Sequence, residues 1–275
     1  MDWIQAAVLG LVQGLTEFLP VSSTGHLILA ERAMGLGENE AYNAFTILIQ
    51  FGAIVAVVGL FWGRVKSVLS GLLGRDRDGL RLFVNLVLGF LPAGVVGLAF
   101  GEGVKKTLYQ LWVIAPAWLL GGLVILWLTR HRRGKAPGDG RTIEMLTFKG
   151  ALVIGLFQVL ALWPGVSRSL ATILGGLAVG LSMTAAVEFS FLLGVATLFA
   201  ATMKEAVFSG EMILQNLGRM QVAIGLVVAA LSAAVAVKWM IGYLSRRSLD
   251  VFGWYRIALA VVTIVLLAAG VVQSA

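Results

Sequence analysis

Six stretches of this sequence are apolar over about the length of a membrane-spanning helix, and this feature limits the fold more than any other. A helix that crosses the hydrocarbon core of a bilayer needs about 20 predominantly apolar residues. The six predicted spans cover residues 44–63, 82–100, 109–129, 186–204, 220–244 and 252–273. Charged residues make up 13% of the chain, about half the share of an average soluble domain. The sequence therefore predicts an all-α polytopic membrane protein.

Two further segments, 3–35 and 149–182, are apolar but interrupted in the middle. Pro20 breaks the first segment, and Pro164-Gly165 breaks the second. Proline lacks the backbone donor that a continuing helix requires. We therefore expect each segment to form a re-entrant helical hairpin, which enters the bilayer and returns to the same side.

Basic residues are divided unevenly among the segments that join the spans. The basic segments are 64–81, 130–149 and 238–256, the last with Lys238, Arg246, Arg247 and Arg256; the segments with few basic residues are 36–43, 101–108 and 205–218. The positive-inside rule places the basic segments in the cytoplasm. The basic segments all lie on the cytoplasmic side only if both broken segments are re-entrant. Segment 3–35 would then enter from the outside, and segment 149–182 from the cytoplasm. This topology also accounts for the net charge of +7 better than nucleic-acid binding does.

The two halves of the chain resemble each other. Gly10-Leu11-Val12-Gln13 is similar to Gly155-Leu156-Phe157-Gln158, and Pro20 and Ser23 correspond to Pro164 and Ser167 at an offset of about 144 residues. Residues 1–147 and 148–275 are therefore predicted to be two repeats, each with one re-entrant hairpin and three spans. An odd number of crossings inverts the second repeat, and inverted repeats with broken helices place a binding site near the midplane of the bilayer.

Polar side chains follow each break, at a depth where such groups are costly and usually functional. Helix N-termini present unpaired N–H groups that suit an anion, and a new half-helix is expected to begin after each break. The candidate phosphate-binding residues are Ser22, Thr24, Ser167, Ser169 and Thr172. Simple capping of the half-helices is the alternative role for Ser22, Thr24 and Ser169.

Three ionisable residues are candidates for the chemistry itself. Glu17 needs a partner when buried, so it either binds a cation together with Gln13, four residues earlier, or pairs with Arg168. His26 is suited to proton transfer near neutral pH, although a lone histidine can also be structural. Arg168 offers a planar fork for phosphate oxygens, whereas its alternative is to extend toward the membrane surface.

These motifs resemble those of the undecaprenyl-diphosphate phosphatase family, which is linked to bacitracin resistance. An (E/Q)xxxE motif stands at Gln13 to Glu17, a PVSSTGH run at Pro20 to His26, and a PGxSRSxxT motif at Pro164 to Thr172. The resemblance extends over essentially the whole chain. It implies hydrolysis of undecaprenyl diphosphate to undecaprenyl phosphate, which recycles the lipid carrier for peptidoglycan synthesis at the outer side of the bacterial plasma membrane.

The resemblance also implies the parts of the site. Glu17, Ser23, His26 and Arg168 would be catalytic, and a divalent cation, Mg²⁺ or Ca²⁺, would be held by Glu17 with help from Gln13. The nucleophile stays open among Ser23, His26 and a metal-activated water.

Other functions make different demands on these residues. A lipid-phosphate flippase or transporter with the same inverted repeats is the main alternative. A second class of membrane lipid phosphatases needs a histidine after its arginine, and none follows Arg168. A purely structural scaffold would have no use for Glu17, His26 and Arg168. The expected partners are a polyprenyl diphosphate and the bilayer, without nucleic acid; a homodimer is one assembly open to the chain.

Overall fold

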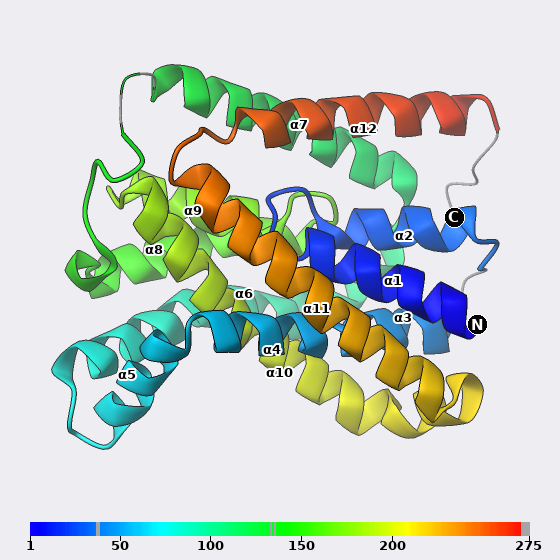
Figure 1. The fold of residues 1–275 in the computed structure, drawn as a ribbon. Coiled ribbons are helices and arrows are strands. Elements are labelled where there is room, and N and C mark those ends of the chain that lie inside the picture. The colour runs from blue at the N-terminus through cyan, green and yellow to red at the C-terminus, as the bar shows by residue number, and fades with distance from the viewer. Residues whose placement is uncertain (37–38, 133, 135, 271–275) are drawn as a thin grey trace.

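The computed structural model describes residues 1–36, 39–132, 134 and 136–270 (Figure 1). Within these ranges the regular structure is helical. Six helical stretches are long and apolar enough to cross a membrane: Glu40–Leu60, Arg77–Gly101, Leu111–His131, Met183–Leu217, Arg219–Leu244 and Asp250–Ala268. The predicted all-α polytopic membrane fold is thereby confirmed. The structure contains one copy of the chain, so the homodimer stays a prediction.

The first half begins with the predicted hairpin. Helices α1 (Trp3–Thr16) and α2 (Ser23–Ala33) are joined by a turn that contains Pro20. At 14 and 11 residues they are about 21 and 17 Å long, too short to cross a core of about 30 Å. The half continues with α3 (Glu40–Leu48), α4 (Gln50–Leu60), α5 (Trp62–Leu72), α6 (Arg77–Leu108) and α7 (Leu111–His131).

The second half has a similar order without a counterpart of α5. After the 3₁₀ turn η1 (Ile143–Met145), the second hairpin consists of α8 (Phe148–Val159), the short turn η2 (Leu160–Leu162) and α9 (Arg168–Ala178). Three long helices follow: α10 (Met183–Leu217), α11 (Arg219–Leu244) and α12 (Asp250–Ala268).

Several segments predicted to be loops are helical. Segment 64–81 contains most of α5 and the start of α6, and segments 101–108 and 205–218 are the last turns of α6 and α10. Hydropathy marks where an apolar stretch ends, whereas a helix continues as long as its backbone hydrogen bonds do. Arg133, Lys135 and the end of the predicted span 252–273 lie outside the described residues.

The packing of the helices follows the predicted repeat. Helix α1 packs along α11, and its counterpart α8 packs along α6. A Cβ atom added to Gly10 would lie 2.6 Å from the carbonyl oxygen of Gly225, and one added to Gly155 would lie 2.6 Å from that of Gly89. Glycine therefore allows the same close approach in both halves. In each half, the first helix of the hairpin thus packs on a long helix of the other half. This reciprocal packing supports the inverted repeat. The repeat and its boundary at residues 147 and 148 stay predictions.

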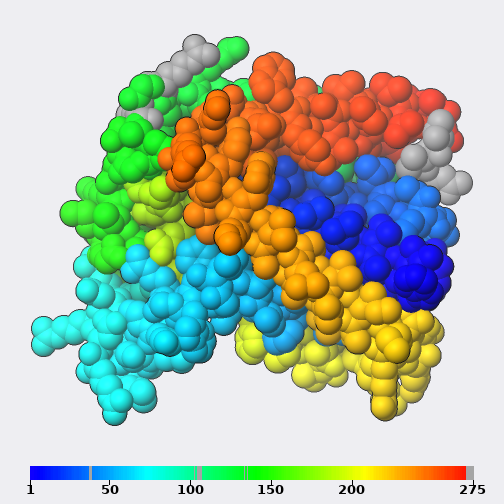
Figure 2. All heavy atoms as spheres, viewed as in Figure 1, coloured from blue at the N-terminus to red at the C-terminus, as the bar shows by residue number. Residues whose placement is uncertain are grey.

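The two halves are interleaved rather than placed side by side. Helix α11 of the second half crosses the visible face of the molecule next to α1 and α4 of the first half (Figure 2). Helix α7 packs against α12, and α4 packs against α10. The main core joins the two hairpins, because it contains Phe18 of the first turn together with Leu170 and Ile173 of α9. The two breaks are thereby brought together in the interior.

An ion-pair cluster ties three elements together away from the breaks. Arg64 of α5 bonds Glu188 of α10 at 2.6 Å and Glu144 of η1 at 2.7 Å. Glu188 is thus engaged in helix packing.

Candidate active site

The two breaks have the same backbone geometry. Ser22 and Ser167 have φ angles of 72° and 75°, and in the described part of the chain they are the non-glycine residues with positive φ. Each directly precedes a new helix, α2 from Ser23 and α9 from Arg168. Such conformations are uncommon outside glycine and concentrate at functional sites. By backbone geometry, Ser22 is therefore equivalent to Ser167, and Ser23 is equivalent to Arg168. The predicted equivalence of Ser23 with Ser167 differs from this by one residue.

A fully buried arginine holds the two breaks together. Arg256 of α12 donates from Nη1 to the carbonyl of Pro20 at 3.0 Å and from Nη2 to the carbonyl of Gly165 at 2.8 Å. It also bonds the carbonyls of Ala117 and Trp118 in α7. Arg256 was predicted to belong to the basic cytoplasmic segment 238–256, and this is wrong because the residue is fully buried within the long apolar helix α12. The signal that could have found it is an arginine within an apolar stretch, where charge is costly.

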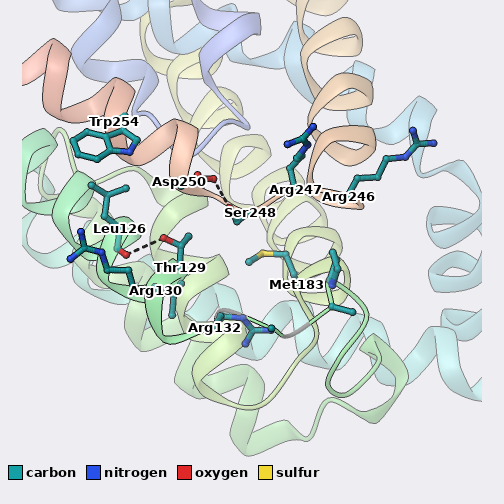
Figure 3. Close-up of a pocket in the computed structure, with 14 residues that line it drawn as sticks. Leu126, Thr129, Arg130, Arg132, Met183, Arg246, Arg247, Ser248, Asp250 and Trp254 are labelled. Carbon is teal, nitrogen blue, oxygen red and sulfur yellow. Dashed lines mark hydrogen bonds between the residues drawn. The ribbon is translucent and has the colours of Figure 1, made fainter.

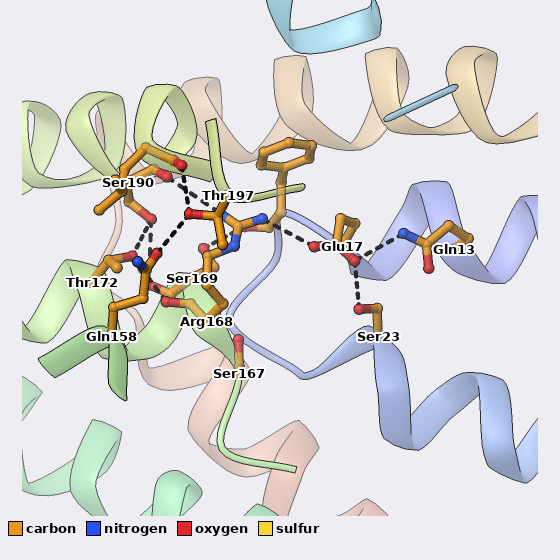
Figure 4. A network of polar contacts seen from close by, with 12 residues as sticks. Gln13, Glu17, Ser23, Gln158, Ser167, Arg168, Ser169, Thr172, Ser190 and Thr197 are labelled. Carbon is orange, nitrogen blue, oxygen red and sulfur yellow. Dashed lines mark hydrogen bonds and ion pairs between the residues drawn. The ribbon is translucent and has the colours of Figure 1, made fainter. Parts of the chain in front are cut away.

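Glu17 is the centre of the polar network between the hairpins (Figure 4). Its Oε1 accepts a hydrogen bond from Arg168 Nη2 at 3.0 Å. Its Oε2 accepts from Ser23 Oγ at 2.6 Å and from Gln13 Nε2 at 2.8 Å. The side chains of Glu17 and Arg168 are only 6% and 11% exposed. The ion pair with Arg168, the alternative role predicted for Glu17, is therefore present. It engages Oε1, while Oε2 accepts the hydrogen bond of Ser23.

Two buried polar atoms beside this carboxylate have no hydrogen-bond partner among the described residues. They are Gln13 Oε1, an acceptor, and Arg168 Nε, a donor. A buried polar group without a partner costs about 1–3 kcal/mol, so such atoms call for a ligand. A carboxamide oxygen suits a hard cation, and a guanidinium N–H suits a phosphate oxygen.

The protein oxygens fit a cation that shares its ligands with the substrate. Within the described ranges no group of three or more His, Cys, Asp or Glu side chains gathers around one point. Gln13 and Glu17 would therefore supply one or two ligands. Mg²⁺ usually takes that number from the protein and keeps water and phosphate oxygens for the rest.

A cavity of about 500 Å³ opens from these groups. Its polar end is lined by Glu17, Ser22, Ser23, Thr24, Ser167 and Arg168, and much of its wall comes from the apolar residues Phe90, Leu91, Val95 and Leu98 of α6. Val95 and Leu98 are exposed on the lipid-facing surface of the protein. The cavity therefore has a polar end for an anion and an apolar side for a hydrocarbon chain.

Four predicted site residues do not line this cavity: Gln13, which is fully buried behind Glu17, and the three described next. Ser169 Oγ donates to the carbonyl of Phe18 at 2.7 Å, and the Thr172 hydroxyl bonds Ser190 Oγ at 2.6 Å. His26 Nδ1 lies 2.7 Å from the carbonyl oxygen of Ser22, and its Nε2 lies 2.8 Å from the Tyr255 hydroxyl. The contact with Tyr255 directs His26 toward α12. In this structure the three side chains support the breaks.

Polar residues that were not predicted also line the cavity. Thr197 Oγ1 donates to Gln158 Oε1 at 3.2 Å, and Gln158 Nε2 donates to the carbonyl of Gly89 at 3.3 Å. Gln158 is the counterpart of Gln13 in the predicted repeat, and this correspondence could have identified it. The carbonyl of Ser190 accepts from Arg168 Nη1 at 3.2 Å and fixes the other side of the guanidinium. No sequence signal marks a backbone carbonyl for such a role.

The fold and the site define an integral membrane protein with a polar network between two helix breaks and a cavity that extends from it along apolar residues of α6. The family model described as bacitracin resistance protein BacA matches residues 6–262. The chain belongs to this family.

Proteins similar to this chain carry one common name. Undecaprenyl-diphosphatase 2 of Rhodospirillum rubrum is 45% identical over 98% of this chain and 97% of its own length. Undecaprenyl-diphosphatase of Methylococcus capsulatus is 43% identical over 96% of this chain and 94% of its own length. The similarity therefore includes both hairpins and all six long apolar stretches.

Proposed function

We propose that this protein is an undecaprenyl-diphosphatase, which hydrolyses undecaprenyl diphosphate to undecaprenyl phosphate and inorganic phosphate. The observation that carries the proposal is that Ser23 and Arg168, from the two breaks, bond different oxygens of Glu17 at the polar end of a lipid-facing cavity. The near full-length relatives named undecaprenyl-diphosphatase support it. The reaction returns the lipid carrier to peptidoglycan synthesis, and removal of the diphosphate form accounts for bacitracin resistance.

The shape of the cavity suits this substrate. The diphosphate would lie between the N-termini of α2 and α9, where backbone N–H groups and the positive ends of the helix dipoles favour an anion. The prenyl chain would lie along Leu91, Val95 and Leu98 of α6 and leave toward the bilayer. One end of the substrate is thus held by charge and the other by apolar contact.

In this proposal Ser23 is the nucleophile. Ser23 Oγ attacks the terminal phosphorus while its proton passes to Glu17 Oε2, 2.6 Å away. The bond from that phosphorus to the bridging oxygen breaks, and undecaprenyl phosphate leaves. Glu17 passes this proton to the leaving phosphate oxygen. A water molecule then loses a proton to Glu17 while its oxygen attacks the phosphoserine, and Glu17 returns that proton to Ser23 Oγ as inorganic phosphate is released. A hydroxyl nucleophile needs an adjacent general base within hydrogen-bond reach, and the carboxylate of Glu17 meets this requirement.

Arg168 stabilises the charge on the transferring phosphoryl group. Two of its nitrogens are held by Glu17 and by the carbonyl of Ser190, and the buried Nε remains to donate to a phosphate oxygen. Because the guanidinium is fixed before the substrate arrives, little reorganisation is needed during the reaction.

Gln13 Oε1 and Glu17 would hold a divalent cation, Mg²⁺ or Ca²⁺, beside the diphosphate. A bound cation would neutralise part of the phosphate charge. His26 supports the first break through the carbonyl of Ser22 and so acts on the position of Ser23.

For the location of the protein we propose the bacterial plasma membrane, with the mouth of the first hairpin on the outer side. The basic residues at the turn between α5 and α6 and in segment 130–149 support this orientation. The segment between α2 and α3 lacks Lys and Arg, as expected for an outer segment.

Release of phosphate separates this proposal from a flippase or transporter. The purified full-length protein is incubated in detergent with undecaprenyl diphosphate and Mg²⁺, and inorganic phosphate is measured. The proposal predicts repeated turnover. A protein that binds or moves the lipid without hydrolysis would release none, because detergent removes the two sides between which transport occurs.

A further inference from the structure

A second cavity, of about 390 Å³ (Figure 3), is lined by the C-terminal end of α7. Tyr109, which precedes α7, lines the active-site cavity, whereas Arg130, near the end of α7, lines the second. The helix has 21 residues, which at 1.5 Å per residue is about 31 Å. The helix breaks contact the middle of α7, where Gly165 lies against Ile114 and Ala117, so about 20 Å of helix separates the second cavity from the catalytic residues.

Positive charge dominates this second cavity. Arg130 and Arg132 line it from the end of α7, and Arg246 and Arg247 line it from the turn after α11 (Figure 3). Among the described residues no carboxylate forms an ion pair with any of the four. Asp250 is the acidic lining residue, and it accepts a hydrogen bond from Ser248. The cavity thus offers several guanidinium groups without a protein counter-ion.

The arrangement goes beyond what membrane topology requires. The positive-inside rule accounts for arginines at helix ends. It does not require that two ends more than 100 residues apart in the chain converge on one hollow. Helix α12 begins at the same place, and its N-cap, Leu249, provides no side-chain hydrogen bond to the first-turn N–H groups. Arginine side chains from two helix ends and the first turn of a third helix therefore border one cavity.

Apolar residues also line this cavity. Leu126, Met183 and Trp254 line the cavity, and Trp254 is 60% exposed on the outside of α12. Tryptophan is typical of the membrane interface, where its ring lies at the level of the lipid headgroups. Guanidinium groups beside such a ring match a phosphate that carries acyl chains better than a soluble anion.

We propose that this cavity binds the phosphate headgroup of an anionic glycerophospholipid, such as phosphatidylglycerol, from the leaflet that these helix ends face. The phosphodiester oxygens accept hydrogen bonds from the arginines, and the acyl chains run past Trp254 along α12. The lipid would bridge the ends of α7 and α11, which contribute the arginines in pairs. The proposal is independent of the catalytic function, because none of these residues lines the active-site cavity.

The test compares two double variants with the same loss of charge. Arg246→Ala with Arg247→Ala removes one side of the cavity. Arg75→Ala with Arg77→Ala is the matched control, because both residues are exposed at the turn between α5 and α6 and line neither cavity. Native mass spectrometry of the full-length protein in detergent measures retention of added phosphatidylglycerol, phosphatidylethanolamine, undecaprenyl phosphate and inorganic phosphate.

We expect the wild type to retain one phosphatidylglycerol in preference to the other three additives. The Arg246/Arg247 variant should lose at least about tenfold in apparent affinity, while the Arg75/Arg77 variant stays within about twofold of the wild type. Normal phosphate release by the variants serves as the check on folding. If the Arg246/Arg247 variant fails that check, Arg130→Ala with Arg132→Ala replaces it.

Other results would overturn the proposal. An equal loss in the cavity variant and its control would mean that only the overall charge attracts the lipid. Preference for undecaprenyl phosphate, or full displacement of phosphatidylglycerol by inorganic phosphate, would assign the cavity to a different ligand.

Discussion

Arg168 and Glu17 lie 151 residues apart in the chain and form a buried ion pair of 3.0 Å. One residue comes from each helix break, so this contact closes the site across the two halves of the protein. It also fixes both functional groups before a substrate is bound. Buried charges that are paired in this way depend strongly on each other.

Replacement of Arg168 should abolish catalysis. Arg168→Ala removes the positive charge that stabilises the transferring phosphoryl group, and we expect turnover to fall by at least about 100-fold. Arg168→Lys should recover little of this, because an ammonium group cannot bond Glu17, Ser190 and phosphate through a planar fork. Phosphate release gives the rate, and a thermal melt reports folding. A folded alanine variant with near-normal turnover would remove Arg168 from the mechanism.

Removal of divalent cations should silence the enzyme. We expect EDTA to stop phosphate release and added Mg²⁺ or Ca²⁺ to restore it. Gln13→Leu should raise the cation concentration needed by about 10- to 100-fold, because it deletes the unpaired Oε1 atom beside Glu17. Cation binding also raises the melting temperature of the native state, so the Mg²⁺-dependent rise measured without substrate should be smaller in Gln13→Leu. Full activity after exhaustive removal of metal would contradict this role.

Arg256 donates hydrogen bonds to four backbone carbonyls, and we call this set of contacts the Arg256 clamp. The clamp should be needed for stability as well as for activity. Arg256→Met leaves four backbone carbonyls without their donor, at about 1–3 kcal/mol for each that stays buried and unpaired. Gly121→Ala tests the same contact without loss of charge, because its Cβ would lie 2.1 Å from Arg256 Nη2. Gly59→Ala is the control, since its Cβ would meet nothing within 4 Å. We expect lower melting temperatures for the first two variants only. Equal melting of Gly121→Ala and Gly59→Ala would argue against the clamp.

The sequence predicted the elements of the fold better than the direction of its side chains. Proline at positions 20 and 164 marked both breaks, and the charge at Glu17 and Arg168 marked the central pair, because each is unusual in an apolar segment. The orientation of His26 depends on Tyr255, which lies 229 residues away in the chain. Likewise Arg256 looked like the end of a basic segment, since its four carbonyl partners become neighbours only when α7, α12 and both breaks have packed together.

The sidedness of the cavity can be measured with single cysteines, because the chain has no native cysteine. Asn39 precedes α3 and Gly138 lies in the loop after α7, and both positions are exposed. We expect Asn39→Cys to react with a membrane-impermeant maleimide in spheroplasts, and Gly138→Cys to react only after permeabilisation. The reverse pattern would place the mouth of the first hairpin in the cytoplasm.

The central claim is that Ser23, activated by Glu17 and faced by Arg168, performs the hydrolysis, and phosphate release by a pair of serine variants tests it most directly. Ser23→Ala removes the hydroxyl that donates to Glu17 at 2.6 Å, whereas Ser169→Ala removes a hydroxyl that donates to the carbonyl of Phe18 at 2.7 Å. We predict that Ser23→Ala loses at least about 100-fold in turnover while the protein stays folded. Ser169→Ala should lose about 1 kcal/mol of stability and keep most of its activity. Near-normal turnover by Ser23→Ala would contradict the account.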